Sequence, residues 1–214
     1  MKKIIYILLS FILVCSLTAC SNHNTTNTKN TAASKASNVS NSDGTQTDLP
    51  SDSNALVVFY SATGSTKAIA ETIAGILDAD IFEITPEDPY TSEDLNWNND
   101  NSRVSIEHND ESKRKVPLIK ATPDDWEKYD TIYIGYPIWW GIAAWPVNGF
   151  IEGNNFTDKT VIPFCTSVSS ELDNSSELLE NTTGTGNWLE SKRFSSNASA
   201  EEIREWLNKL KLNP

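Results

Sequence analysis

Residues 54–77 read NALVVFY-SATGST-KAIAETIAGIL, and this stretch decides the fold. Leu56 to Tyr60 is a continuous apolar run, which is typical of a parallel strand buried on both faces. The apolar residues that follow recur at the spacing of one helix face: Ile69, Ile73, Ile76 and Leu77. The sequence therefore predicts a strand that passes into a helix through a turn of small residues, Ser61–Thr66.

Hydroxyl side chains dominate this turn. Because the helix that follows presents its positive end and its free N–H groups there, a phosphate can be held without a basic side chain. We therefore predict an anion-binding site at residues 61–66. A tight connection without any ligand is the alternative.

Residues 1–19 have the pattern of a secretory signal. Met1-Lys2-Lys3 is positively charged, and Ile4–Leu17 is almost wholly apolar but too short to span a membrane as a stable helix. Leu17-Thr18-Ala19-Cys20 resembles the bacterial lipobox, which implies cleavage before Cys20 and lipidation of that residue. An ordinary signal peptide with an incidental cysteine is the alternative.

Residues 20–53 begin with Cys20 and continue as a Ser, Thr, Asn, Ala and Asp segment with scarcely one large apolar residue. Such a segment cannot bury enough surface to offset the entropy of ordering it, so a disordered tether is expected. Its mean reach as a flexible coil is roughly 30 Å. We expect an extracytoplasmic protein, lipid-anchored to the bacterial cell membrane, whose folded domain comprises residues 54–214.

Charge and composition exclude several classes of function. The formal net charge of −12 argues against nucleic acid as a partner. Neither His23 nor His108 has the neighbouring ligands that a metal site needs, so no metal is expected. Cys165 ends an apolar run and is expected to be buried. Motifs of dinucleotide-binding folds, nucleotide triphosphatases, cysteine phosphatases and nucleophile-elbow hydrolases are absent from the sequence.

The folded domain alternates between strand and helix patterns. Further strands are predicted at 80–84, 131–136, 160–165 and 188–194, with Pro137 ending the third strand. Ser199 and Glu202 form a predicted capping box for the last helix. Such alternation predicts an α/β fold in which a parallel sheet carries helices on both faces.

The polar segment 85–130 is long for a compact domain. One or two helical turns are predicted near 101–109. We expect a solvated loop, and the alternative is that some of its side chains cover the ligand site: Tyr90, Trp97, Arg103 and His108.

Three loops leave the carboxyl ends of the predicted strands, where ligands bind in open α/β sheets. Residues 61–66 offer phosphate-binding donors, 137–141 two adjacent indoles and a glycine, and 166–170 hydroxyls and backbone amides. A phosphate that carries a flat aromatic ring fits all three. For at least one of Trp139 and Trp140, a place in the core is an equal alternative to stacking on that ring.

The same residues resemble the flavodoxin-like family. Ser-Ala-Thr-Gly-Ser-Thr after a buried strand looks like its phosphate loop, and Gly-Tyr-Pro-Ile-Trp-Trp-Gly like its second flavin loop. Pro-Phe-Cys-Thr-Ser is similar to its third loop, and Trp-Leu-Glu-Ser-Lys-Arg-Phe to its tail. The resemblance implies a three-layer sandwich around a five-stranded parallel sheet in the order 2-1-3-4-5.

The resemblance also implies an FMN site. The cofactor-binding residues that it assigns are Ser61, Ala62, Thr63, Gly64, Ser65 and Thr66 for the phosphate, and Pro137, Ile138, Trp139, Trp140, Gly141, Thr166, Ser167, Val168 and Ser169 around the isoalloxazine. Members of the family usually carry glycines directly after Thr-Ser in the third loop, whereas this chain has Val168-Ser169-Ser170. A valine is costly there if the position needs φ > 0.

Three functions are compatible with these patterns. The first is extracytoplasmic electron transfer by an FMN-binding domain that exchanges electrons with a redox partner protein. The second is an FMN-dependent NAD(P)H oxidoreductase that reduces quinones or other small-molecule acceptors, which the long segment 85–130 favours. The third is a degenerate binding module without flavin, which Val168 motivates.

Overall fold

The computed structural model describes residues 54–167 and 174–210 of the chain. The expected signal peptide and tether, residues 1–53, lie outside the described residues, as do Val168 and Ser169 of the third loop. In the part that is described, no helix is long and apolar enough to cross a membrane.

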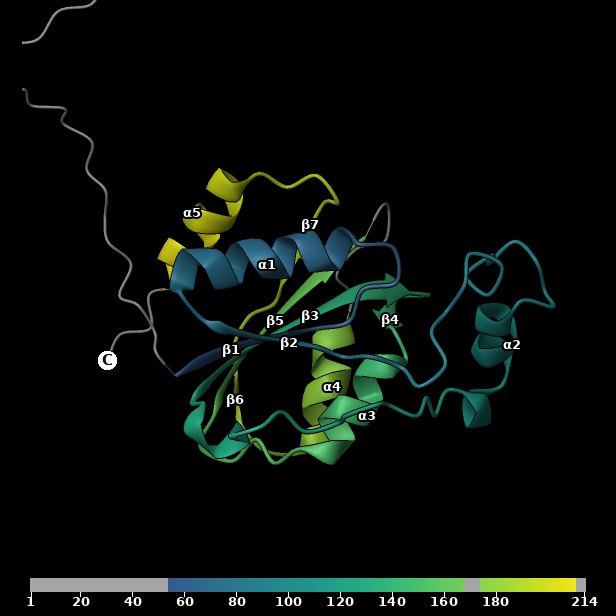
Figure 1. The fold of residues 1–214 in the computed structure, drawn as a ribbon, viewed down its shortest axis with the longest axis horizontal. Helices are drawn as coiled ribbons and strands as arrows, with labels where there is room; N and C mark the ends of the chain where they lie inside the picture. The colour runs from purple at the N-terminus through teal and green to yellow at the C-terminus, as the bar shows by residue number, and fades with distance from the viewer. Residues whose placement is uncertain (1–53, 168–173, 211–214) are drawn as a thin grey trace, which may run out of the picture. The chain divides into compact units, whose positions relative to one another are not determined.

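Strands and helices alternate along the chain (Figure 1). The strands are β1 (Ala55–Phe59), β2 (Asp80–Glu83), β3 (Thr131–Trp139), β4 (Ile142–Ala143), β5 (Thr160–Thr166), β6 (Asn187–Trp188) and β7 (Lys192–Phe194). The α-helices are α1 (Ser65–Leu77), α2 (Arg103–Asn109), α3 (Pro146–Gly153), α4 (Ser175–Thr183) and α5 (Ala200–Leu210). Two short 3-10 helices, η1 (Glu111–Lys113) and η2 (Trp126–Lys128), lie between β2 and β3.

The sheet has the order β2-β1-β3-β5-β6, and every neighbouring pair in this order is parallel. Counted along the chain without the short antiparallel β4, these are strands 2-1-3-4-5. The predicted α/β flavodoxin-like topology is therefore confirmed.

Helices cover the sheet on both faces, which makes three layers (Figure 1). One face packs against α1 and α5, and the buried helix residues there are Ile69, Ala70, Ile73, Ala74, Leu77, Ile203, Trp206 and Leu207. The other face packs against α3 and α4 through Val147, Phe150, Ile151 and Leu179.

Strand β1 lies between β2 and β3 and is buried along its whole length. Ala55, Val57 and Phe59 point into the core under α1 and α5. Leu56 and Val58 point into the core on the other face. Because both faces are covered, the strand needs apolar residues at every position and shows no alternation.

The prediction that Pro137 ends the third strand is wrong. β3 continues to Trp139, and Pro137 pairs with Thr166 of β5. Proline has no N–H to donate. The Pro137 carbonyl nevertheless accepts a hydrogen bond from Ala144 N, just after β4, at 3.1 Å, so β3 stays paired on that side.

The predicted strand 188–194 is two short strands, β6 and β7, which both pair with β5. Between them the chain leaves the ladder, where Glu190 is exposed and the Ser191 hydroxyl lies 3.0 Å from the Ser176 hydroxyl of α4. The predicted start of the last helix is confirmed, since Glu202 N donates to Ser199 Oγ at 3.1 Å.

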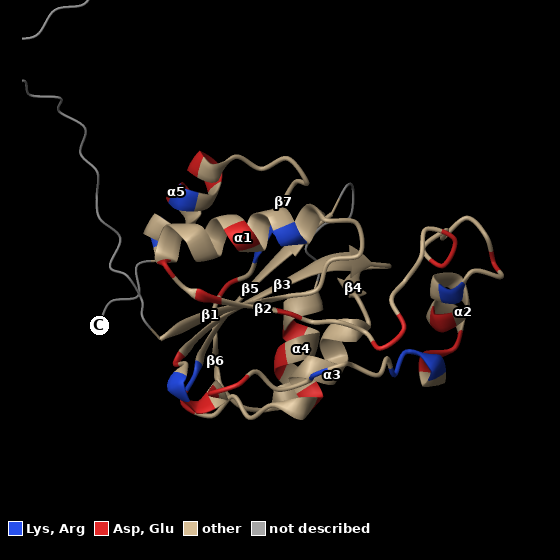
Figure 2. Cartoon of the chain, viewed as in Figure 1, with Lys and Arg blue, Asp and Glu red and all other residues tan. Residues whose placement is uncertain are grey.

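Charged residues lie on the helices, on the connecting segments and on the short strands β2 and β7 (Figure 2). The three strands at the centre of the sheet, β1, β3 and β5, contain no Lys, Arg, Asp or Glu. The segment around α2 carries both signs of charge close together (Figure 2). Part of the charge in that segment is paired: Arg103 with Asp88 and Glu107, and Arg114 with Glu111.

Candidate functional site

The first loop connects β1 to α1 and has the features predicted for an anion site. Gly64 precedes the helix with φ +92°, which glycine adopts without strain, and its N–H donates to Ser61 Oγ at 3.1 Å. No side chain caps the N-terminus of α1, and its first turn holds no acidic residue. The positive end of α1 is therefore open to a negatively charged group.

The residues of this loop differ in their exposure to solvent. Thr63 and Gly64 are exposed, Ser61, Ala62 and Ser65 are half-buried, and Thr66 is buried. A Cβ placed on Gly64 would have no atom within 4 Å, so there is open space beside the loop. A phosphate has room to reach the N–H groups at the start of α1.

A hydrogen bond between two buried threonines joins the first loop to the third. Thr66 Oγ1 and Thr166 Oγ1 lie 2.8 Å apart, although the two residues are 100 positions apart in the sequence. Thr166 ends β5, and half-buried Ser167 follows it. The prediction that these two loops share one edge of the sheet is thereby confirmed for those of their residues that the structure describes.

The second loop is a β-hairpin rather than an open loop. β3 and β4 pair Ile138 with Ala143 and Trp139 with Ile142, which leaves Trp140-Gly141 as a two-residue turn. Both turn residues have positive φ, +47° for Trp140 and +81° for Gly141, as a type I′ turn requires. This conformation is uncommon for a bulky residue and costs of order 1–3 kcal/mol.

Residues 54–210 match the sequence family described as flavodoxin. The chain belongs to this family. None of the curated proteins compared with it gives a significant match.

Several solved structures are similar to this chain. A protein from Bacteroides eggerthii, assigned as a flavoprotein, is 41% identical and superposes with a TM-score of 0.68 over 76% of this chain and 100% of its own. A second, from Bacteroides uniformis, is 39% identical with a TM-score of 0.67 over 73% and 98%. A flavoprotein of Lactobacillus acidophilus, solved in complex with FMN, is 21% identical with a TM-score of 0.54 over 72% and 99%, which supports the fold alone.

The two adjacent tryptophans of this flavodoxin-family chain have different surroundings. Trp139 is half-buried and packs edge-to-face on three rings, with centroid distances of 5.8 Å to Tyr60, 5.1 Å to Tyr90 and 5.3 Å to Trp145. Trp140 is 41% exposed and stacks on His108 at 4.3 Å with an interplanar angle of 8°. Trp139 thus belongs in part to the core, while Trp140 lies at the surface.

The expectation that segment 85–130 is only a solvated loop is wrong. Tyr90 and His108 pack on the second loop, and Arg103 lies over the Tyr90 ring with 3.9 Å between Cζ and the ring centroid. Trp97, in contrast, is 67% exposed. The segment folds back because its apolar and aromatic residues, though widely spaced, find partners on the sheet edge.

Tyr60 and Trp145 are neighbours of the site that the sequence did not single out. Tyr60 is buried and directly precedes the first loop, and burial raises its pKa above the usual range. Trp145 is fully buried beneath the hairpin turn, with the Arg114 guanidinium 4.7 Å from its ring centroid. In the sequence, the one feature that indicates a role for Tyr60 is its position directly before the predicted loop 61–66.

Cys165 directly precedes the third loop and is a buried free thiol. Its side chain is buried, as predicted, and burial raises its pKa to about 12. A thiol with so high a pKa carries almost no thiolate at neutral pH. The other functional groups of the three loops at this edge of the sheet are hydroxyls, backbone amides and aromatic rings.

We expect each single substitution Thr66→Val and Thr166→Val to lower the free energy of unfolding by about 1–3 kcal/mol, because the remaining buried hydroxyl loses its partner. The double variant should lose less than the sum of the two, and urea denaturation measures all three values. Strict additivity would show that the two hydroxyls are not coupled.

Proposed function

We propose that this flavodoxin-family chain binds FMN across the three loops and acts in electron transfer. The observation that carries the proposal is the Thr66–Thr166 hydrogen bond, which places an uncapped helix start and the third loop at one edge of the sheet. The aromatic second loop leaves the neighbouring strand at the same edge. When bound, FMN would supply one- and two-electron chemistry.

The described residues suit the two ends of this cofactor. Ser61, Thr63, Ser65 and Thr66, with the first N–H groups of α1, would hold the phosphate. Indole side chains at 139–140 and hydroxyls at 166–167 would flank the flat ring. The phosphate end needs no lysine or arginine, because backbone dipoles and hydroxyls supply the donors. A complex with FMN in the Lactobacillus acidophilus flavoprotein is consistent with this choice of ligand.

An NAD(P)H-dependent oxidoreductase is the second candidate. Tyr90 and His108 pack against the second loop and build up the protein beside it. An electron carrier needs only a flavin whose ring is accessible at one edge. Side chains that pack next to the ring suit an enzyme that selects a small acceptor. A module without flavin is the third candidate, because Val168 stands where the family usually has glycine.

The N-terminal pattern supports a further part of the proposal. We infer that Cys20 carries lipid and holds the protein on the outer side of the bacterial cell membrane, with residues 21–53 as a tether. The charged start, the apolar run 4–17 and the Leu-Thr-Ala-Cys sequence support this location. A lipid chain on Cys20 would supply membrane affinity without a spanning helix.

The purified full-length chain should bind FMN, and Thr63→Val should weaken binding about tenfold or more, through loss of a hydrogen bond to a charged phosphate worth about 1.5–3 kcal/mol. Quenching of FMN fluorescence measures the dissociation constant. Thr72→Val, which lies further along α1 and bonds to Ala68 O, is the control and should leave it unchanged. No FMN binding by the parent chain would favour the module without flavin.

A carrier is expected to oxidise NADH and NADPH no faster than free FMN does, with quinones as acceptors. Stopped-flow and steady-state absorbance at the nicotinamide band measure the rate. Turnover that requires the protein and saturates with the quinone would instead establish the oxidoreductase.

Cys20→Ala should release the protein from the membrane fraction of the cells that express it, because the lipid is lost. Cys15→Ala is the matched control, since Cys15 leaves with the signal, and this variant should stay with the membranes. Immunoblots of separated fractions measure both. Membrane association of the Cys20→Ala protein would contradict the lipid anchor.

A further inference from the structure

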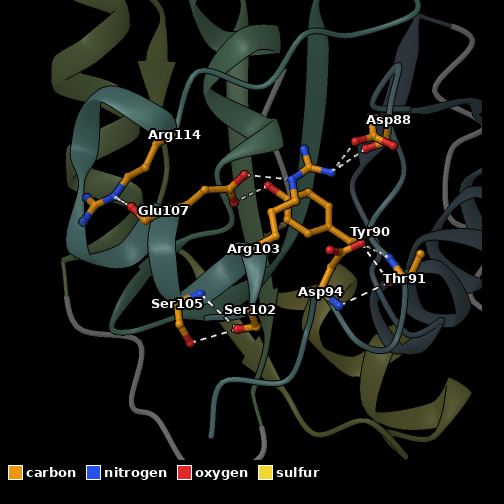
Figure 3. A network of polar contacts seen from close by, with 9 residues as sticks. All are labelled: Asp88, Tyr90, Thr91, Asp94, Ser102, Arg103, Ser105, Glu107 and Arg114. Carbon is orange, nitrogen blue, oxygen red and sulfur yellow. Dashed lines mark hydrogen bonds and ion pairs between the residues drawn. The ribbon is translucent and has the colours of Figure 1, made fainter. Parts of the chain in front are cut away.

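The side chains of Tyr90, Arg103 and Glu107, all from segment 85–130, form a compact polar cluster (Figure 3). Tyr90 Oη donates to Glu107 Oε2 at 2.6 Å, and Arg103 Nε donates to Glu107 Oε1 at 2.8 Å. The Arg103 guanidinium also lies over the Tyr90 ring. Each of the three side chains thus contacts the other two.

The cluster is held more firmly than a surface ion pair. The Glu107 side chain is 7% exposed and that of Arg103 22% exposed, so solvent screens their attraction only partly. Both oxygens of the Glu107 carboxylate are engaged by different partners, which fixes its rotation. Arg103 Nη1 also donates to the Asp88 carbonyl at 2.8 Å, which holds the chain next to Tyr90.

Tyr90 connects this cluster to two loops of the candidate site. Its ring lies edge-to-face against Trp139 of the second loop, with 5.1 Å between centroids. It also lies 6.5 Å from the ring of Tyr60, which directly precedes the first loop. Tyr60 and Trp139 are themselves 5.8 Å apart and perpendicular. The three rings therefore restrict one another's orientation.

We propose that Tyr90, Arg103 and Glu107 form a positioning clamp that fixes the orientation of the Trp139 indole. The effect of the clamp on cofactor binding rests on the proposed function, in which Trp139 flanks a flavin ring. Tyr90 is a positioning residue here, because it acts through Trp139. The rival explanation is that the cluster only ties segment 85–130 to the domain and leaves Trp139 unaffected.

The test compares two Tyr→Phe variants in the full-length chain. Tyr90→Phe removes the hydrogen bond to Glu107 and keeps the ring. Tyr129→Phe is the matched control, because Tyr129 Oη donates to a carboxylate oxygen of Asp80 at 2.7 Å. That bond lies at the start of β2 and β3, at the opposite end of the strands from the three loops. Urea denaturation measures the loss of stability in each variant.

The first readout needs no ligand. In protein labelled with 5-fluorotryptophan, the ¹⁹F resonance of Trp139 is assigned from its absence in Trp139→Phe. We expect this resonance to shift or broaden in Tyr90→Phe and to stay in place in Tyr129→Phe. An unchanged Trp139 resonance in Tyr90→Phe overturns the clamp, whatever the loss of stability. Arg103→Lys, which keeps the charge but loses the planar group over Tyr90, should act in the same direction.

The second readout concerns the ring side of the site. FMN should bind several-fold more weakly to Tyr90→Phe, and within twofold of the parent value to Tyr129→Phe. Equal FMN affinity in Tyr90→Phe, with a shifted Trp139 resonance, overturns the link between clamp and cofactor. Absence of FMN binding in the parent chain refutes the proposed function and that link together, while the ¹⁹F comparison still decides whether the clamp orients Trp139.

Discussion

The structure depends on the pairing of β1 with a parallel strand on each side. β1 is bonded to β2 and β3 and is covered on both faces, so its direction and height in the sheet are fixed. The residues that follow its carboxyl end, at Phe59, therefore lie between the ends of β2 and β3. Tyr60 N still donates to Gly135 O at 3.0 Å, and the loop leaves the sheet only after that bond.

This constraint explains why the residues of the candidate site lie together at one edge of the sheet. In a parallel sheet all strands end on the same side. Here Phe59 at the end of β1 pairs with Gly135 of β3, and Thr166 at the end of β5 pairs with Pro137, two residues further along β3. Within β3, Gly135 leaves room for the ring of Phe164 on β5, because a Cβ on Gly135 would overlap that ring. Residues distant in sequence, such as Thr66 and Thr166, then reach bonding distance.

Most of the fold could be predicted from the sequence, because its signals are local. The apolar run in β1 and the helical spacing of Ile69 and Ile73 each report on a few neighbouring residues. The errors arose where a distant partner decides the conformation. Pro137 is a poor strand residue by itself, but pairing with Thr166 and with the hairpin extends β3 through it.

For the candidate site, the positions of the first loop and of the start of the third, Thr166 and Ser167, followed from the sequence, whereas the surroundings of the second loop did not. No local pattern shows that Tyr90 and His108 turn back onto Trp139 and Trp140. The strained φ of Trp140 is compatible with these contacts, since stacking on His108 and burial of the adjacent indole offset its backbone cost. A turn held in this way keeps both indoles in defined places, which would lower the entropy cost of binding the flat ring of the proposed cofactor beside them.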